Sequence, residues 1–237
     1  MPEPTSATAI EVRHERTESA RLDNFVDGVF AFAVTLLIIS GGGLPTNVLA
    51  LEHALRGVPA FAACFAELAW FWHGHVRWRD TARLTDGASL KLSLLLVFFA
   101  LIFVFPLHLA FSGFFNGISD GVLSPEFPDT NGLRAATALF ACFGLSFACM
   151  AGTLAWLFRH GLRKGTLSRG DMITIRVSLR VWTFCAAIGL LSTLIALLAL
   201  AAQSGSLMSL AGFCYVVLAF TGVSAARYRE RLEATLP

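Results

Sequence analysis

Charged residues are scarce in this 237-residue chain, and their scarcity argues against a soluble globular domain. They make up 14% of the sequence, against about 25% in ordinary soluble domains. Apolar residues reach 56% and the mean hydropathy is +0.67. A chain this apolar cannot enclose all of its hydrophobic surface in one core, so much of that surface must face lipid. The net charge of +2 gives no sign of a nucleic-acid partner, and we expect none.

The sequence also lacks the residue patterns that most enzymes and metal centres require. Its five cysteines stand singly in apolar segments without C-x-x-C spacing, which argues against a metal cluster or a redox dithiol. It contains no G-x-S-x-G motif and no glycine-rich phosphate loop carrying a lysine. His73 and His75 point about 200° apart on a helix, so they cannot bind one metal ion together. We therefore expect no enzymatic activity, no metal site and no cofactor.

The chain does have six apolar segments of about the length that crosses a bilayer, roughly 20 residues. A polar segment, residues 1–20, precedes them without the apolar run of a signal peptide. A single six-helix domain is expected over residues 21–227, with a polar tail at 228–237. The sequence thus predicts an all-α polytopic membrane protein. The expected spans cover residues 25–40, 58–76, 90–115, 133–158, 173–202 and 207–226.

The positions of the cations predict the orientation of these spans. All but two of the 18 lysines and arginines precede the first span, lie in or beside the second-to-third and fourth-to-fifth connections, or follow the last span. The two exceptions are Arg56 and Arg134. Because short cytoplasmic connections retain Lys and Arg, this asymmetry predicts that both termini are cytoplasmic.

The first predicted span carries a narrow stripe of residues on one helical face. Gly28, Phe32, Thr35 and Ile39 fall within about 60° of one another at 100° per residue. The pattern by itself favours packing against neighbouring helices, because small and apolar residues allow close approach in lipid. The alternative interpretation is a narrow pore in which Phe32 forms a hydrophobic constriction and Thr35 offers an oxygen to a cation.

The stretch that contains this stripe resembles the first-helix signature of the transmembrane protein 175 family of potassium channels, R-x-x-x-F-S-D-G-V-F-A-I-A-x-T-L-L. The second predicted span ends in a further resemblance, to the family pattern W-x-x-H-H-R. The chain departs from these patterns at Val26, Phe32 and Val76. It matches them at Arg21, Phe25, Asp27, Gly28, Val29, Phe30, Ala31, Ala33, Thr35, Leu36, Leu37, Trp72, His75 and Arg77.

The resemblance implies a potassium channel without the usual potassium-channel filter loop. In this family, prokaryotic chains with one six-helix unit form homotetramers, and the first helix lines the pore. By position, Phe32 takes the place of the constriction residue and Thr35 that of a residue implicated in potassium selectivity. Potassium is then the permeant ion, and the prokaryotic plasma membrane is the expected location. The motif network that fixes the first helix against the second would contain Arg21, Phe25, Asp27, Trp72, His75 and Arg77.

Two other functions remain open from the sequence. Glu67 lies mid-way through the second span, where an ionisable side chain is expensive and suggests function. It is either a proton-linked site, as in a small proton-coupled transporter, or a structural hydrogen-bond acceptor. The second alternative is a non-conducting structural member of the family in which Phe32 seals the pore permanently.

Overall fold

The chain is helical throughout the part that the structure describes. This structure, a computed structural model, describes residues 6–40, 45–124 and 132–235, with side chains from residue 20 onward, and these ranges contain no strand. The elements are α1 (Ser6–Ser40), α2 (Val48–Arg56), α3 (Val58–Ala82), α4 (Gly87–Ile118), α5 (Leu133–Lys164), α6 (Arg169–Ala201), α7 (Gly205–Phe213), the 3₁₀ helix η1 (Cys214–Phe220) and α8 (Thr221–Thr235).

Length and composition identify five or six candidate membrane spans among the described elements. Within the described ranges, five stretches are long and apolar enough: Ala20–Ser40, α4, α5, α6, and Gly205–Thr235, which joins α7, η1 and α8. The pair α2 and α3 passes the same test only when taken together and is bent by 51° at Gly57, so it adds a sixth span if the pair crosses as one. The prediction of an all-α membrane protein is confirmed, and its six spans agree with the upper count. The sequence analysis did not anticipate α2.

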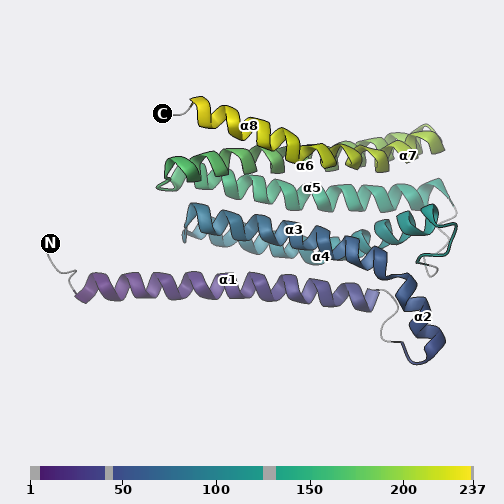
Figure 1. Ribbon diagram of the computed structural model, residues 1–237, viewed down its shortest axis with the longest axis horizontal. Coiled ribbons are helices and arrows are strands. Elements are labelled where there is room, and N and C mark those ends of the chain that lie inside the picture. Colours follow the sequence, from purple (N-terminus) through teal and green to yellow (C-terminus); the bar gives the residue numbers. More distant parts are fainter. Residues whose placement is uncertain (1–5, 41–44, 125–131, 236–237) are drawn as a thin grey trace.

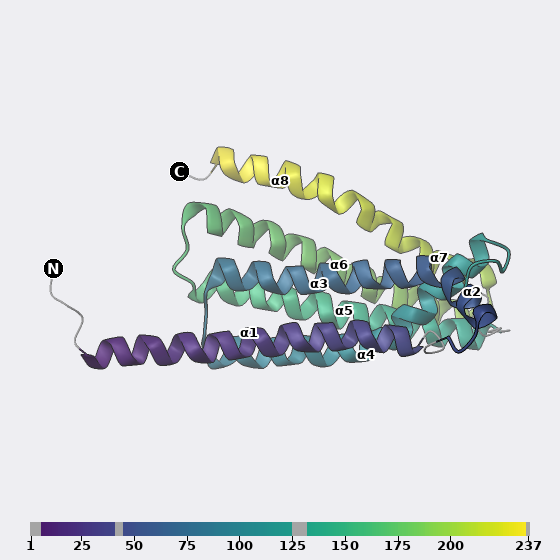
Figure 2. The ribbon, with the colours of Figure 1, turned by 60° about the horizontal axis from the view of Figure 1, so that its bottom comes forward.

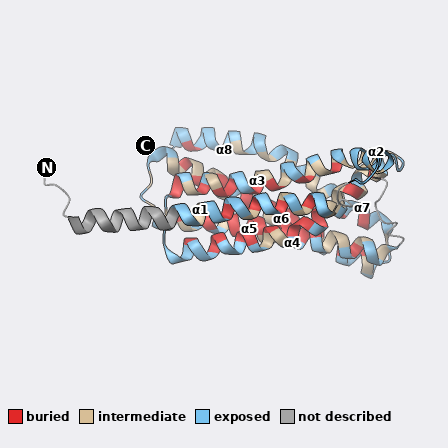
Figure 3. Cartoon of the chain, turned by 90° about the horizontal axis from the view of Figure 1, so that it is seen from below, coloured by how far each residue is buried: buried red, intermediate tan, exposed pale blue. Residues whose placement is uncertain are grey.

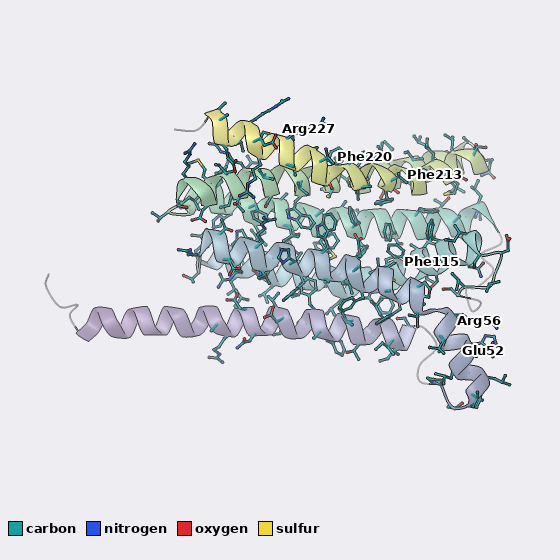
Figure 4. The ribbon with its side chains drawn as sticks, viewed as in Figure 1. Glu52, Arg56, Phe115, Phe213, Phe220 and Arg227 are labelled. Carbon is teal, nitrogen blue, oxygen red and sulfur yellow. The ribbon has the colours of Figure 1, made fainter. Side chains whose placement is uncertain are left out.

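The spans lie side by side in an elongated bundle, with α1 along one edge and α8 along the opposite edge (Figures 1 and 2). The described part of the chain begins and ends at one end of the bundle. The α3–α4 and α5–α6 connections lie at this same end (Figure 1). The α2 helix projects at the other end, where Arg56 forms an ion pair with Glu52 at 2.7 Å (Figure 4). The cation-rich connections and both described ends of the chain are therefore gathered together.

An aromatic cluster forms the centre of the bundle where α3, α4, α5 and α6 meet. The rings of Phe71 and Trp182 stack with centroids 5.2 Å apart, and Phe147 meets the edge of Phe71 at 5.4 Å. Phe103 lies 5.9 Å from Phe71. Figure 3 shows the buried residues concentrated on these inner faces, whereas most of α8 is exposed. Offset and edge-on ring contacts of this kind fix the relative positions of the helices.

Close backbone contact holds α5 against α6. A Cβ atom built on Gly144 would lie 2.7 Å from the carbonyl oxygen of Gly189, and one built on Gly189 would lie 2.7 Å from the carbonyl oxygen of Gly144. Small residues permit this approach between membrane helices, where dispersion contacts rather than the hydrophobic effect drive packing. The two glycines therefore mark the tightest point of the α5–α6 pair.

Candidate functional site

The α1 helix has one face that packs against its own chain. Val26, Phe30, Ala33 and Leu37 are buried and recur at intervals of three or four residues. This spacing places them on one side of the helix, and α1 packs there on α3 and α4. The fold thus fixes which side of α1 is left without a partner.

The stripe identified in the sequence lies on the other side of α1. Phe32 is 55% exposed and Ile39 is 62% exposed, and Thr35 and Gly28 are exposed as well. A Cβ atom built on Gly28 would meet no other atom within 4 Å. Within the described part of this chain, no neighbouring helix covers the stripe. The packing interpretation therefore finds no partner helix among the described residues of a single copy.

Thr35 is the polar residue of the stripe. Its hydroxyl donates a hydrogen bond to the backbone carbonyl of Ala31 at 3.1 Å. A hydroxyl that donates in this way keeps its lone pairs as acceptors. The Thr35 oxygen is thus presented at the exposed face in a state that can accept a donor or coordinate a cation.

Hydrogen bonds and an ion pair attach α1 to α3 near the stripe. The indole Nε1 of Trp72 donates to Oδ1 of Asp27 at 2.7 Å. One turn earlier on α1, Asp23 receives two hydrogen bonds from Arg79, from Nε at 2.6 Å and from Nη2 at 3.1 Å. Arg79 also donates to the carbonyl oxygen of Leu84, which follows the end of α3. The structure therefore brings Asp27 and Trp72 together as members of the expected motif network.

Sequence analysis missed Asp23 and Arg79, although the residue spacing contains a signal for them. Asp23 and Asp27 are four residues apart on α1, while Trp72 and Arg79 are seven residues apart on α3, so each pair shares one helix face. Arg79 was counted only among the cations that set the orientation. A search for acidic residues and hydrogen-bond donors on the facing sides of α1 and α3 would have predicted the contact between Asp23 and Arg79.

The remaining network residues are distributed differently. His75 is buried and its Nε2 lies 3.0 Å from Oγ of Ser93, so it connects α3 to α4 rather than to α1. Arg21, Phe25 and Arg77 are exposed. The described structure brings none of these three into a hydrogen bond or an ion pair with Asp27 or Trp72.

Glu67 lies on a different side of α3 from Trp72. Five residues separate the two, which turns their side chains about 140° apart. Glu67 is partly buried and is close enough to Cys185 of α6 and Tyr215 of η1 to interact electrostatically with both. Among the described side chains, none forms a hydrogen bond or an ion pair with the Glu67 carboxyl group. Glu67 is therefore remote from the exposed face of α1.

Known proteins resemble this chain over the segment that contains the network. Residues 21–106 match the model of the family described as endosomal/lysosomal potassium channel TMEM175. Over these residues, the chain is similar to the TMEM175 family. A relative from Marivirga tractuosa named "Potassium channel" is 33% identical over 90 residues, which are 38% of this chain and 36% of that protein. The chain thus aligns with about a third of the length of this curated relative.

A solved member of the TMEM175 family has the same fold along almost the whole chain. It is the potassium channel MtTMEM175, crystallised as a variant in complex with a nanobody–MBP fusion protein. The match covers 89% of this chain and 93% of that one, with a TM-score of 0.74 and 22% identity. At this identity the likeness shows the fold. The likeness in fold to this channel therefore extends beyond residues 21–106.

Proposed function

We propose that this chain forms a potassium-permeable cation channel as a homotetramer, with α1 of each subunit at the central axis. The observation that carries the proposal is the exposed stripe of Gly28, Phe32, Thr35 and Ile39 on a helix whose opposite face is anchored to α3 and α4. The match of residues 21–106 to the TMEM175 family and the likeness in fold to a solved potassium channel support the same function.

A pore of this kind needs several copies, because one helix cannot enclose a channel. Around a symmetry axis, the exposed faces of α1 would meet and the Phe32 side chains would stand at one level. Rings at that level form a hydrophobic constriction that excludes water when closed and admits ions when the side chains move aside. Thr35, one turn further along, would offer its free lone pairs to a partly dehydrated cation.

We also propose an orientation and a location for the bundle. Most of the lysines and arginines lie in or beside the α3–α4 and α5–α6 connections, which are at the end where the described chain begins and ends. By the preference of Lys and Arg for the cytoplasmic side, this end faces the cytoplasm and both termini are inside. The membrane is the plasma membrane of a prokaryote, and the protein acts without an enzymatic step or a cofactor.

Potassium flux from liposomes tests the proposal, and the chain offers matched controls. Phe32→Ala should raise the flux, because it removes the bulk at the constriction. Thr35→Val should change the ratio of potassium to sodium flux. Phe98→Ala and Thr183→Val should change neither quantity. Phe98 is 56% exposed on α4, and exposed Thr183 donates to the carbonyl of Leu179 at 2.7 Å, as Thr35 does to that of Ala31.

Other outcomes would replace the proposal by one of its alternatives. No flux above that of empty vesicles in wild type and in Phe32→Ala would contradict conduction. A silent wild type with a conducting Phe32→Ala variant would indicate a permanent seal at that position. Saturable flux that follows a pH gradient and disappears in Glu67→Gln would indicate a proton-coupled transporter.

A further inference from the structure

A groove with basic and apolar parts lies between α6 and the last span, far from the exposed face of α1. It encloses about 960 Å³ between α6 and the segment made of η1 and α8, and the end of α5 contributes Leu162. This volume is within the range of about 300–1,000 Å³ that small-molecule sites occupy. The described chain leaves the groove open along its length. Figures 2 and 4 show α8 diverging from α6 on this side of the bundle.

Charge and hydrophobicity are separated along the groove. Arg176 and Arg180 of α6 line one end, which lies next to the α5–α6 connection. Phe184, Ala187 and Phe220 line the part nearer the membrane centre. Ala187 lies seven residues beyond Arg180, about 10 Å further into the bilayer at 1.5 Å per residue. The groove therefore has a cationic mouth at the membrane surface and an apolar interior.

The two arginines at the mouth lack acidic partners. Neither Arg176 nor Arg180 forms an ion pair with a carboxylate of the described chain, and no acidic residue lines the groove. The guanidinium group of Arg180 lies over the ring of Tyr228 on α8, 4.5 Å from its centroid, which holds it at the mouth. An adjoining groove of about 700 Å³ adds Arg159 and Arg163 and also lacks an acidic residue. The positive charge is thus left for a partner outside the chain.

We propose that this groove binds one anionic phospholipid, with its phosphate at Arg176 and Arg180 and an acyl chain along Phe184, Ala187 and Phe220. Arginine recognises phosphate through its planar fork of N–H donors. Basic pockets between membrane helices on the cytoplasmic side bind acidic lipid headgroups in this manner. A free phosphate ion would leave the apolar part of the groove unfilled, and an uncharged lipid would leave the arginines without a counter-ion.

Native mass spectrometry of the full-length, delipidated protein tests the site with two lipids of identical acyl chains, phosphatidylglycerol and phosphatidylcholine. Wild type should retain phosphatidylglycerol in preference to phosphatidylcholine. The double variant R176Q/R180Q should reduce phosphatidylglycerol retention by about tenfold, since it removes charge-assisted hydrogen bonds. The control R227Q/R231Q removes the same charge from exposed positions on α8 outside the groove and should bind as wild type does.

A second variant tests the apolar part of the groove without changing its charge. Ala187→Phe should reduce phosphatidylglycerol retention, and inorganic phosphate should fail to displace the lipid from wild type. Equal retention of both lipids, or equal losses in R176Q/R180Q and R227Q/R231Q, would overturn the proposal. Unchanged phosphatidylglycerol retention in Ala187→Phe would also overturn the proposal. An altered subunit number in that variant, with no lipid bound to wild type, would instead make the groove an interface between copies.

Discussion

The indole nitrogen of Trp72 donates a hydrogen bond to the carboxylate of Asp27 at 2.7 Å, which joins α1 to α3 beside the exposed stripe. A hydrogen bond to a charged group contributes about 1.5–3 kcal/mol to stability. Asp27→Ala should therefore lower the free energy of unfolding by about 1–3 kcal/mol, and Asp27→Asn by less because it keeps an acceptor. Unfolding in detergent measures both changes. Asp80→Ala, at an exposed position on α3, should be close to neutral; an equal loss there would refute the assignment.

Asp23 and Arg79 should prove energetically coupled. The guanidinium of Arg79 is only 9% exposed and makes two hydrogen bonds to Asp23, so either single substitution leaves a partly buried charge without its counter-ion. In a double-mutant cycle of Asp23→Asn and Arg79→Gln, we expect a coupling energy of about 1–3 kcal/mol. A cycle of Asp23→Asn with Arg83→Gln provides the control, because exposed Arg83 donates to the Asp80 backbone instead. Coupling energies of equal size in the two cycles would contradict the pairing.

Asp86 should give stability a defined dependence on pH. It caps α4 through the backbone nitrogen of Ser89, and Nε2 of His160 lies 2.7 Å from its other oxygen. Partial burial raises the pKa of the Asp86 carboxyl group, but hydrogen bonds from Ser89 and His160 outweigh it and hold the pKa below its usual value. A depressed pKa stabilises the fold above the unfolded-state pKa, and this contribution is lost as the pH falls through the folded-state pKa.

Asp86→Ala should therefore unfold about 2–4 °C below wild type at neutral pH, as expected for a lost helix cap. The difference in unfolding temperature between wild type and Asp86→Ala should narrow below about pH 4. Thermal unfolding across pH 3–7, roughly the range in which carboxyl groups titrate, would measure this. Asp86→Asn preserves the helix cap and loses the charge. Its unfolding temperature should lie between those of wild type and Asp86→Ala. A difference that stays constant with pH would show that the carboxylate charge makes no contribution.

The contact between Gly144 and Gly189 predicts sensitivity to a single methyl group. Gly144→Ala places a Cβ within 2.7 Å of a backbone oxygen that cannot move alone, so α5 and α6 must separate. Overpacking of this kind costs about 1–3 kcal/mol. Gly152→Ala, on the same helix with nothing within 4 Å, should be neutral or slightly stabilising because alanine favours helix. Unfolding measurements that rank the two variants in the opposite order would contradict this contact.

A substitution at Gly28 can distinguish packing within a subunit from packing between subunits. A larger side chain there meets nothing in its own chain, so Gly28→Leu should leave the unfolding of a dispersed single subunit unchanged. If α1 lies at the axis of a tetramer, the same variant should lower the subunit number or the potassium flux. Native mass spectrometry and liposome flux measure the two effects. Wild-type assembly together with wild-type flux would place Gly28 against lipid.

Hydropathy was sufficient to predict the six spans, because long apolar segments have few alternatives in a bilayer. Helical periodicity was sufficient to group Gly28, Phe32, Thr35 and Ile39, since 100° per residue fixes a face without knowledge of neighbours. The same periodicity could not decide what that face meets. The structure shows that Val26, Phe30, Ala33 and Leu37 are buried on the opposite side and that no described part of the chain covers the stripe.

Contacts between helices were harder to predict. The bond between Asp23 and Arg79 depends on how two helices are aligned along their length, which hydropathy leaves undetermined. Arg79 also fitted a simpler role as one of many cytoplasmic cations. The backbone contact of Gly144 with Gly189 had no sequence signal that set these glycines apart from Gly152. The α2 helix was missed because its nine residues are too few for a span and follow a polar turn.

The attachments of α1 are uneven along its length. Among the described side chains, the hydrogen bonds from α3 to α1 end at Asp23 and Asp27, whereas the stretch from Phe30 to Leu37 is held by apolar contacts. In lipid such contacts are exchanged for acyl chains at little cost. A tilt of α1 about its Asp23 end would thus preserve every directional bond and displace Phe32, Thr35 and Ile39 by increasing amounts. In such a tilt the Asp23 end of α1 would stay in place, and the Ile39 end would move furthest.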